Sequence, residues 1–181
     1  MQPFFIDSSR LQLRSFSIDF LESLLKGPAD LKSHFDLHLP DPFTEFPESI
    51  SASIKHIQDS ESNFPFLSYA IILKEENTFI GQCGFVNPPD ISGAVEFGYE
   101  IAKDYRGRGF ADESIKSLIQ AAFINHDSNT IMAHTLAEKN ASNHLLIKNG
   151  FVFEKSIADT KDGDIWKWFL TRKMHQFRQL M

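Results

Sequence analysis

One stretch of the sequence, residues 94–123, constrains the fold more than any other. Its first part, AVEFGYEIA, predicts a strand over Ala94–Ala102. A loop with two glycines and two arginines follows, and beyond it apolar residues recur at the spacing of a helix over Ala111–Ile124. These apolar residues would share one face of the helix: Ala111, Ile115, Leu118, Ile119, Ala122 and Phe123. A strand, a glycine loop and an amphipathic helix in this order predict a protein that mixes strands with helices.

The loop itself, Arg106–Ala111, is neither of two common phosphate-binding motifs. A dinucleotide motif would need a third glycine where Asp112 stands, and a Walker loop would need Gly-Lys-Ser/Thr. Its glycines can still let successive backbone N–H groups turn toward one anion, at a helix start that carries partial positive charge. The alternative is a plain glycine turn with two solvated arginines, and the loop residues alone leave both interpretations open.

The other predicted elements complete the order β, α, α, β, β, β, α, β, α, β, β. Between the first two helices, Leu31–Phe46 has no clear period. There is no repeat, low-complexity tract or linker, so one domain over residues 1–181 is expected. The remaining strands are predicted at Arg10–Phe16, Phe66–Leu73, Phe79–Val86, Thr130–Ala137, Phe151–Ala158 and Ile165–Arg172, and the remaining helices at Ile18–Leu25, Pro47–Gln58 and Asn140–Asn149.

Charge and cysteine content exclude several classes. The formal net charge of −6 argues against nucleic acid as the main partner, because phosphate neutralisation needs a basic face. Cys83 is the only cysteine, so no intrachain disulfide is possible, and a cytoplasmic protein is expected. The sequence has neither a secretory signal pattern nor an apolar run of membrane-spanning length.

Two motifs in this order of elements resemble the GNAT superfamily of acetyl-CoA-dependent N-acetyltransferases, and within it the RimJ/RimL-like group. The first is the family's coenzyme motif, Arg or Gln, two residues, Gly, one residue, Gly or Ala, which Arg106, Gly109 and Ala111 match. The second is an Asn-x-Ser pair followed by a helix and Lys-x-Gly-Phe, which residues 140–151 match. The resemblance implies a mixed, mostly antiparallel central sheet of about seven strands flanked by helices, with a splay between the fourth and fifth strands.

The resemblance also implies where acetyl-CoA binds. A free backbone N–H within Tyr99–Ile101 would polarise the thioester carbonyl, and the loop would hold the coenzyme pyrophosphate. Asp112 departs from the small or hydroxylated residue usual in the group, and its carboxylate would repel a pyrophosphate unless it points away. The implied coenzyme-binding residues are Ile101, Arg106, Gly107, Arg108, Gly109, Phe110, Ala111, Asn140 and Ser142.

Acetyl transfer also needs a base for the amine and a proton for the leaving thiolate. Glu96 and Glu100 lie on one strand at even spacing, so without a bulge they share a face, and both are candidates for the base. Ser142 resembles the family hydroxyl near the sulfur, a candidate general acid. Asn and Ser are also the preferred helix caps, so Asn140 or Ser142 can instead cap the helix that starts here.

The acceptor amine stays open. An α-amine has a pKa about 2.5 units below that of lysine, a difference of about 3.5 kcal/mol that a lysine acetylase must supply, so an α-amine is slightly favoured. We expect Leu31–Phe46 to form a substrate wall. The competing interpretations are a non-catalytic acetyl-CoA sensor and an interaction domain whose loop binds nothing. No metal is expected, since His34 and His38 lack further ligands, and the chain can be a monomer or a homodimer.

Overall fold

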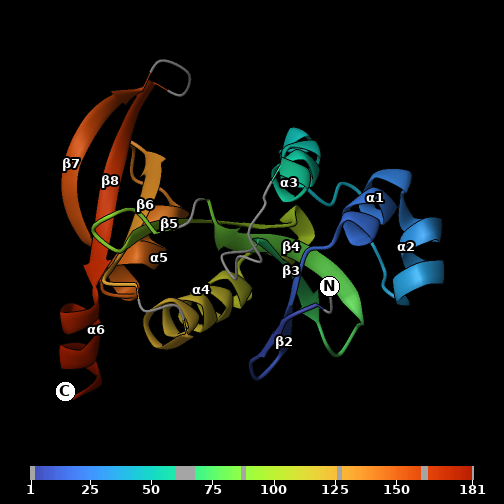
Figure 1. The fold of residues 1–181 in the computed structure, drawn as a ribbon, viewed down its shortest axis with the longest axis horizontal. Helices are drawn as coiled ribbons and strands as arrows, with labels where there is room; N and C mark the ends of the chain where they lie inside the picture. The colour runs from blue at the N-terminus through green and yellow to red at the C-terminus, as the bar shows by residue number, and fades with distance from the viewer. Residues whose placement is uncertain (1–2, 60–67, 87–88, 126–127, 160–162, 181) are drawn as a thin grey trace. The chain divides into compact units, whose positions relative to one another are not determined.

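The computed structural model describes residues 3–59, 68–86, 89–125, 128–159 and 163–180, which form the strands and helices labelled in Figure 1. The strands are β1 (Phe5–Asp7), β2 (Leu11–Ser15), β3 (Ser68–Leu73), β4 (Thr78–Phe85), β5 (Ala94–Ile101), β6 (Thr130–Leu136), β7 (Val152–Asp159) and β8 (Gly163–Thr171). The α-helices are α1 (Ile18–Lys26), α2 (Pro28–Phe35), α3 (Glu48–Asp59), α4 (Phe110–Gln120), α5 (Ala141–Lys148) and α6 (Arg172–Gln179). No helix among these residues is long and apolar enough to cross a membrane.

The strands pair in the order β1-β2-β3-β4-β5-β6-β8-β7. The pairs with a described register are antiparallel, except that β5 and β6 run parallel. The predicted mixed, mostly antiparallel sheet is therefore confirmed, with β1 as a strand that the sequence did not indicate. Two compact units divide the chain, residues 1–84 with 99–117 and residues 85–98 with 118–181, and the boundaries fall within β4, β5 and α4. Each unit is described by itself, and the expectation of one domain stays a prediction.

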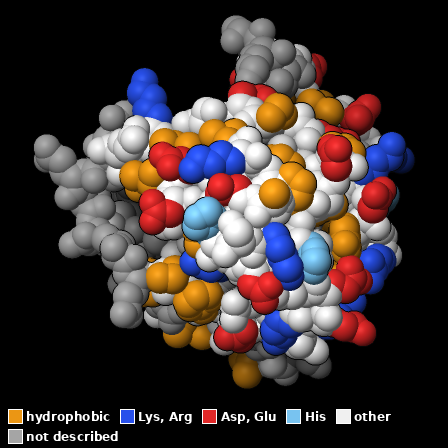
Figure 2. All heavy atoms as spheres, turned by 90° about the vertical axis from the view of Figure 1, so that its right-hand side faces the viewer, with side chains coloured by type: hydrophobic (Ala, Val, Ile, Leu, Met, Phe, Trp, Pro, Cys, Tyr) orange, Lys and Arg blue, Asp and Glu red, His pale blue; other side chains and the backbone are white. Residues whose placement is uncertain are grey.

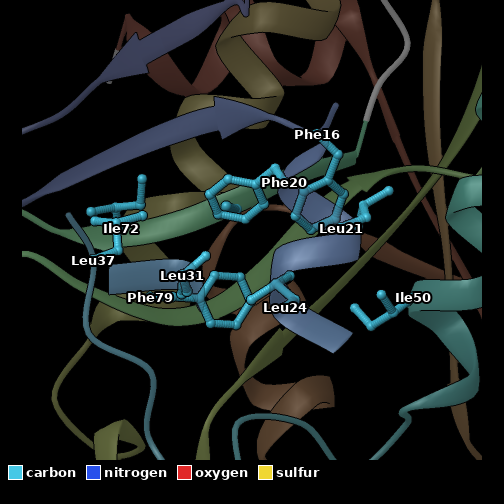
Figure 3. Packing of buried hydrophobic residues seen from close by; sticks show 10 residues of the cluster. Phe16, Phe20, Leu21, Leu24, Leu31, Leu37, Ile50, Ile72 and Phe79 are labelled. Atoms are coloured by element: carbon cyan, nitrogen blue, oxygen red, sulfur yellow. The ribbon is translucent and has the colours of Figure 1, made fainter. Parts of the chain in front are cut away.

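The first unit is built on an antiparallel meander that carries a core of aliphatic and phenyl side chains (Figure 3). Helix α1 begins where the Ser17 hydroxyl accepts from the backbone N–H of Phe20, and it ends at Gly27, whose φ of 105° few other residues adopt. The cluster comprises Phe16, Phe20, Leu21, Leu24, Leu31, Leu37, Ile50, Ala70, Ile72 and Phe79. Full burial of each large member contributes about 1.5–3 kcal/mol, so this cluster fixes the helices on the strands.

The segment predicted to be irregular, Leu31–Phe46, begins inside a helix. Helix α2 starts at Pro28, a residue suited to the first helical position, and stops at Asp36, which has a left-handed backbone. Phe35 and Phe43 pack against the core cluster, whereas Phe46 is exposed. The prediction of an irregular segment is therefore wrong at its start, because the eight-residue α2 buries only Leu31 and gives little amphipathic signal.

The second unit contains the parallel pair of β5 and β6, where the family resemblance implies a splay. Strands β5 and β6 pair from Ala94↔Thr130 to Glu96↔Met132, and no further register is recorded for their described residues, although both strands continue. Strand β6 instead stays paired with β8 along its whole length. The chain ends in α6, which begins with a Thr171 hydroxyl cap and which the sequence did not predict.

Candidate active site

The glycine loop takes a shape that requires its glycines. Gly107 and Gly109 have φ values of 74° and 82°, in the left-handed region that residues with a side chain rarely adopt. Phe110, the first residue of α4, is buried and holds the helix start in place. Arg10 holds the loop from β2's side of the unit by donating to the Arg108 carbonyl at 3.0 Å and by pairing with Glu113 on α4 at 2.8 Å.

The backbone N–H groups of this loop are available to a ligand. Within the described part of the chain, no hydrogen bond is recorded for the N–H of any residue from Gly107 to Ala111. The first N–H groups of α4 have no partner within the helix, which is the general condition of a helix start. Five successive donors at a helix N-terminus form a nest that suits an anion with several oxygens, such as a pyrophosphate.

Both arginines of the loop are paired with carboxylates of the same unit. Arg106 donates from Nε to the Ile101 carbonyl at 2.8 Å and lies 2.9 Å from a Glu45 oxygen. Arg108 lies 3.5 Å from Glu76. All of these charged groups are exposed, and exposed pairs of this kind contribute about 0–1 kcal/mol, so a phosphate can displace either carboxylate.

The carboxylate of Asp112 has a cation of its own. Lys116, one turn further along α4, places Nζ 2.9 Å from Asp112 Oδ2. The partial positive charge at the N-terminus of α4 also stabilises the Asp112 carboxylate. The negative charge that the sequence places beside the loop is therefore compensated locally.

Glu100, at the carboxyl end of β5, is held by several donors of its own unit. Its carboxylate accepts from the Thr44 hydroxyl and from the Glu45 backbone N–H, both at 2.6 Å, and from Gln82 at 3.3 Å. The oxygens of this carboxylate are thus already used to fix the Thr44–Glu45 segment. This arrangement favours an anchoring role, and a role of Glu100 as base stays a prediction.

Glu96, near the amino end of β5, has one recorded side-chain partner among the residues that the structure describes. Its Oε1 lies 2.8 Å from Nδ1 of His134 on β6, and the two side chains are 31% and 26% exposed. The pair sits where the register of β5 and β6 ends, since Glu96 opposes Met132 and His134 lies two residues beyond it. A carboxylate and an imidazole in contact, both reachable from solvent, can accept and pass on a proton.

The second motif supplies a helix cap and a hydroxyl. Asn140 caps α5, because its side chain accepts from the Asn143 backbone N–H at 3.0 Å. Ser142 stands inside the first turn, and no partner for its hydroxyl is recorded among the residues that the structure describes. Phe151, at the end of the motif, is buried against Phe97 of β5. Of the two polar residues, Asn140 is therefore the cap, and a role of Ser142 as general acid stays a prediction.

Comparison with known proteins decides the family. A family model described as "Acetyltransferase (GNAT) domain" matches residues 10–152. The chain belongs to the GNAT acetyltransferase family. The GNAT relatives include the Uncharacterized N-acetyltransferase p20 of Bacillus licheniformis, 29% identical over 82% of this chain and 81% of that protein. Another is the Uncharacterized N-acetyltransferase YjdG of Bacillus subtilis (strain 168), 25% identical over 86% of this chain and 94% of that protein.

Solved GNAT structures share the fold over nearly the whole chain. A spermidine N-acetyltransferase SpeG variant from Vibrio cholerae has a TM-score of 0.69 at 21% identity and covers 95% of this chain and 99% of its own. RimL, a ribosomal L7/L12 alpha-N-protein acetyltransferase, has a TM-score of 0.67 at 19% identity and covers 94% and 96%. The predicted family is confirmed, and RimL, which names the predicted group, is among the structures with this fold.

Other sequence candidates have structural explanations. Cys83 is fully buried, and desolvation raises the pKa of its thiol, so it is not a ready nucleophile. In the described ranges, no group of three His, Cys, Asp or Glu side chains could hold a metal ion, and His34 bonds to its neighbour Asp30. Trp168 is buried with its indole N–H on Thr135.

Two functional candidates escaped the sequence-based prediction. Glu45 reaches Arg106 from a segment with no recognisable motif, and nothing in its surroundings signals that contact. His134 lies on the predicted strand Thr130–Ala137, and no motif marks it. A signal was present, because a histidine on the strand next to Glu96 in the parallel pair can meet its carboxylate across the two strands.

Proposed function

We propose that this acetyltransferase moves the acetyl group of acetyl-CoA directly to a primary amine, either a protein N-terminus or a small-molecule amine. The observation that carries the coenzyme assignment is the run of five backbone N–H groups without a recorded acceptor, Gly107 to Ala111, at the start of α4. In this proposal these groups bind the pyrophosphate, and Arg106 and Arg108 exchange Glu45 and Glu76 for phosphate oxygens. A backbone N–H within Tyr99–Ile101 polarises the thioester carbonyl.

The remaining roles are assigned from the position and the recorded hydrogen bonds of each residue. Glu96, at the end of the β5–β6 register, belongs to the base, acting directly or through a neighbouring group. Ser142, whose hydroxyl has no recorded partner in the described chain, protonates the leaving thiolate. Asn140 orients the first turn of α5, on which Ser142 stands. The Ile101 carbonyl accepts a hydrogen bond from Arg106 Nε and so fixes the position of that arginine.

For the acceptor, we favour an α-amine. RimL acts on a protein α-amine and SpeG on spermidine, so proteins with this fold serve both classes. The Glu96–His134 pair is about a third exposed, and such a base is better matched to an amine that is partly neutral at pH 7 than to lysine. The net charge is −6, but acidic and basic side chains are interspersed on the face drawn in Figure 2. The side chains drawn there by type therefore form no continuous acidic surface for a polycation.

The test is release of coenzyme A from acetyl-CoA in the presence of defined amines. Three probes suffice: a lysine-free peptide with a free α-amine, the same peptide with its α-amine blocked and one lysine added, and spermidine. We expect the first to be acetylated fastest, with mass spectrometry placing the acetyl group on the N-terminus. Binding of acetyl-CoA without turnover of any probe would contradict the proposal and favour a non-catalytic sensor.

A further inference from the structure

We propose that His134 is the group that takes the proton from the acceptor amine and that Glu96 positions it. This inference rests on the proposed function and adds a catalytic residue to it. All of the contacts that carry it lie in the second unit.

The geometry of the pair assigns the two nitrogens of His134 different tasks. Nδ1 faces Glu96 Oε1 at 2.8 Å, and no partner for Nε2 is recorded among the described residues. When a carboxylate holds Nδ1–H, the neutral ring carries its free electron pair on Nε2. His134 therefore presents an oriented acceptor on a side chain that is 26% exposed.

The position of the pair is not one that the sheet needs for its own stability. The recorded β5–β6 register ends at Glu96↔Met132, so His134 lies beyond the last recorded pair, and Glu96 is its one recorded side-chain partner among the described residues. On its other side β8 keeps β6 in place through the full ladder, with Lys167 opposite His134. A polar bridge across a diverging parallel pair suits a site better than it suits a core.

The charges around His134 leave Glu96 as its dominant neighbour. Lys167, the cross-strand neighbour on β8, is paired with Glu154 of β7 at 2.9 Å. Lys167 also contributes to lowering the pKa of Asp90, which is held down mainly by its bond to Ser92. Two carboxylates thus offset the lysine charge, while the Glu96 carboxylate touches the imidazole directly.

The proton balance uses no external reagent. The acceptor arrives as an ammonium ion, Nε2 of His134 takes one proton, and the imidazolium later releases it to solvent. The neutral amine attacks the thioester carbonyl, the C–N bond forms and the C–S bond breaks. The second nitrogen proton leaves the tetrahedral intermediate as the thiolate is protonated, in the proposed function through Ser142. The products are the amide and coenzyme A.

The experiment measures kcat/KM against pH for the lysine-free peptide with wild type, His134→Gln, Glu96→Gln and the exposed control His34→Gln. Wild type is expected to show an acid limb, because a protonated base cannot accept the proton of the amine. His134→Gln should lower kcat/KM about 10²–10³-fold and abolish the limb, with the acetyl-CoA KM changed less than about twofold. Glu96→Gln should also lower kcat/KM, because the imidazole loses the carboxylate that holds Nδ1 and orients the ring.

A second readout separates catalysis from folding. Exogenous imidazole should restore part of the activity of His134→Ala, which a merely structural role would not allow. If His134→Gln keeps its rate and its acid limb while wild type turns over, this inference is overturned and Glu96 acts alone. If wild type binds acetyl-CoA but acetylates no probe, the proposed function fails and the inference fails with it.

Discussion

The two ends of strand β5 carry the same kind of residue in opposite circumstances. Near its amino end, Glu96 has one recorded partner, an imidazole, and lies where a strand pair ends. At its carboxyl end, Glu100 accepts from a hydroxyl, a backbone N–H and an amide, and so fixes the Thr44–Glu45 segment. Two carboxylates four residues apart can therefore divide the work, one for chemistry and one for structure.

The difference teaches that residue type and spacing do not distinguish a base from an anchor. A carboxylate already surrounded by donors gains little from taking a proton, because protonation would break those bonds. A carboxylate with a single imidazole neighbour can share a proton with it. The number and kind of donors around each oxygen, rather than the position in the motif, separates the two roles.

The largest expected effect is on the rate of acetyl transfer, which should depend on Glu96 far more than on Glu100. Glu96→Gln should lower kcat/KM for an amine acceptor by up to about 10²–10³-fold, no more than loss of the base that it positions. Glu100→Gln keeps an oxygen acceptor and should lose about tenfold at most. Steady-state assays of both variants with one peptide measure this, and the reverse order of the two losses would refute the division of roles.

The next effect is on the free energy of unfolding, which should depend on Glu100 more than on Glu96. Glu100→Ala leaves the Thr44 hydroxyl and the Glu45 N–H without their acceptor, which should lower the free energy of unfolding by about 1–3 kcal/mol. At this chain length the unfolding midpoint would fall by about 3–10 °C. Glu96→Ala, which removes a half-exposed pair, should cost less than about 1 kcal/mol. Equal midpoints for the two variants would argue against an anchor at Glu100.

The smallest effect tests the link from Glu100 to the loop. Glu45 bonds to Glu100 through its N–H and to Arg106 through its carboxylate, so it competes with phosphate for that arginine. Glu45→Gln should tighten acetyl-CoA binding about two- to fivefold by calorimetry, and Glu76→Gln, the matched control at the longer Arg108 pair, should change it less. Weaker binding in Glu45→Gln would contradict the competition.

The tighter acetyl-CoA binding expected of Glu45→Gln should depend on pH through the ionisation of Glu45. Its hydrogen bond to Arg106, and then the charge of Arg106, lower the pKa of Glu45. The Glu45 carboxylate therefore stays ionised until the pH falls below about 4.3, the usual glutamate pKa. Above that pH it continues to compete with phosphate for Arg106. The advantage of Glu45→Gln should be constant from about pH 8 to about pH 5, and it should vanish as the pH falls through the lowered value.

The sequence predicted most of the strands, because their buried residues alternate or run together as in LQLRS, where Leu11 and Leu13 are fully buried. It also predicted the stripe of α4, and the glycine loop through its motif. It missed β1, α2 and α6, which are short and bury few side chains. Local pattern carries information only where a segment has a buried face.

The candidate site was predictable where a motif fixes backbone shape and unpredictable where side chains meet across the chain. Gly107 and Gly109 were identified because their left-handed backbone calls for glycine. The partners of Glu96 and Glu100 come from β6 and from the segment before α3, at separations of 38 and 56 residues. Local periodicity does not encode such contacts, because they depend on which strands and loops the tertiary fold places side by side.

The measurement that tests the central claim most directly is thermal unfolding with and without acetyl-CoA, on wild type and on Gly109→Trp. Ligand at a hundred times its dissociation constant adds about 2.7 kcal/mol, which should raise the wild-type midpoint by about 5–10 °C. Gly109→Trp cannot keep the left-handed loop and should show no shift, although it still unfolds cooperatively. No shift in wild type at millimolar acetyl-CoA would contradict a coenzyme site at Arg106–Ala111, and with it the acetyl transfer that depends on that site.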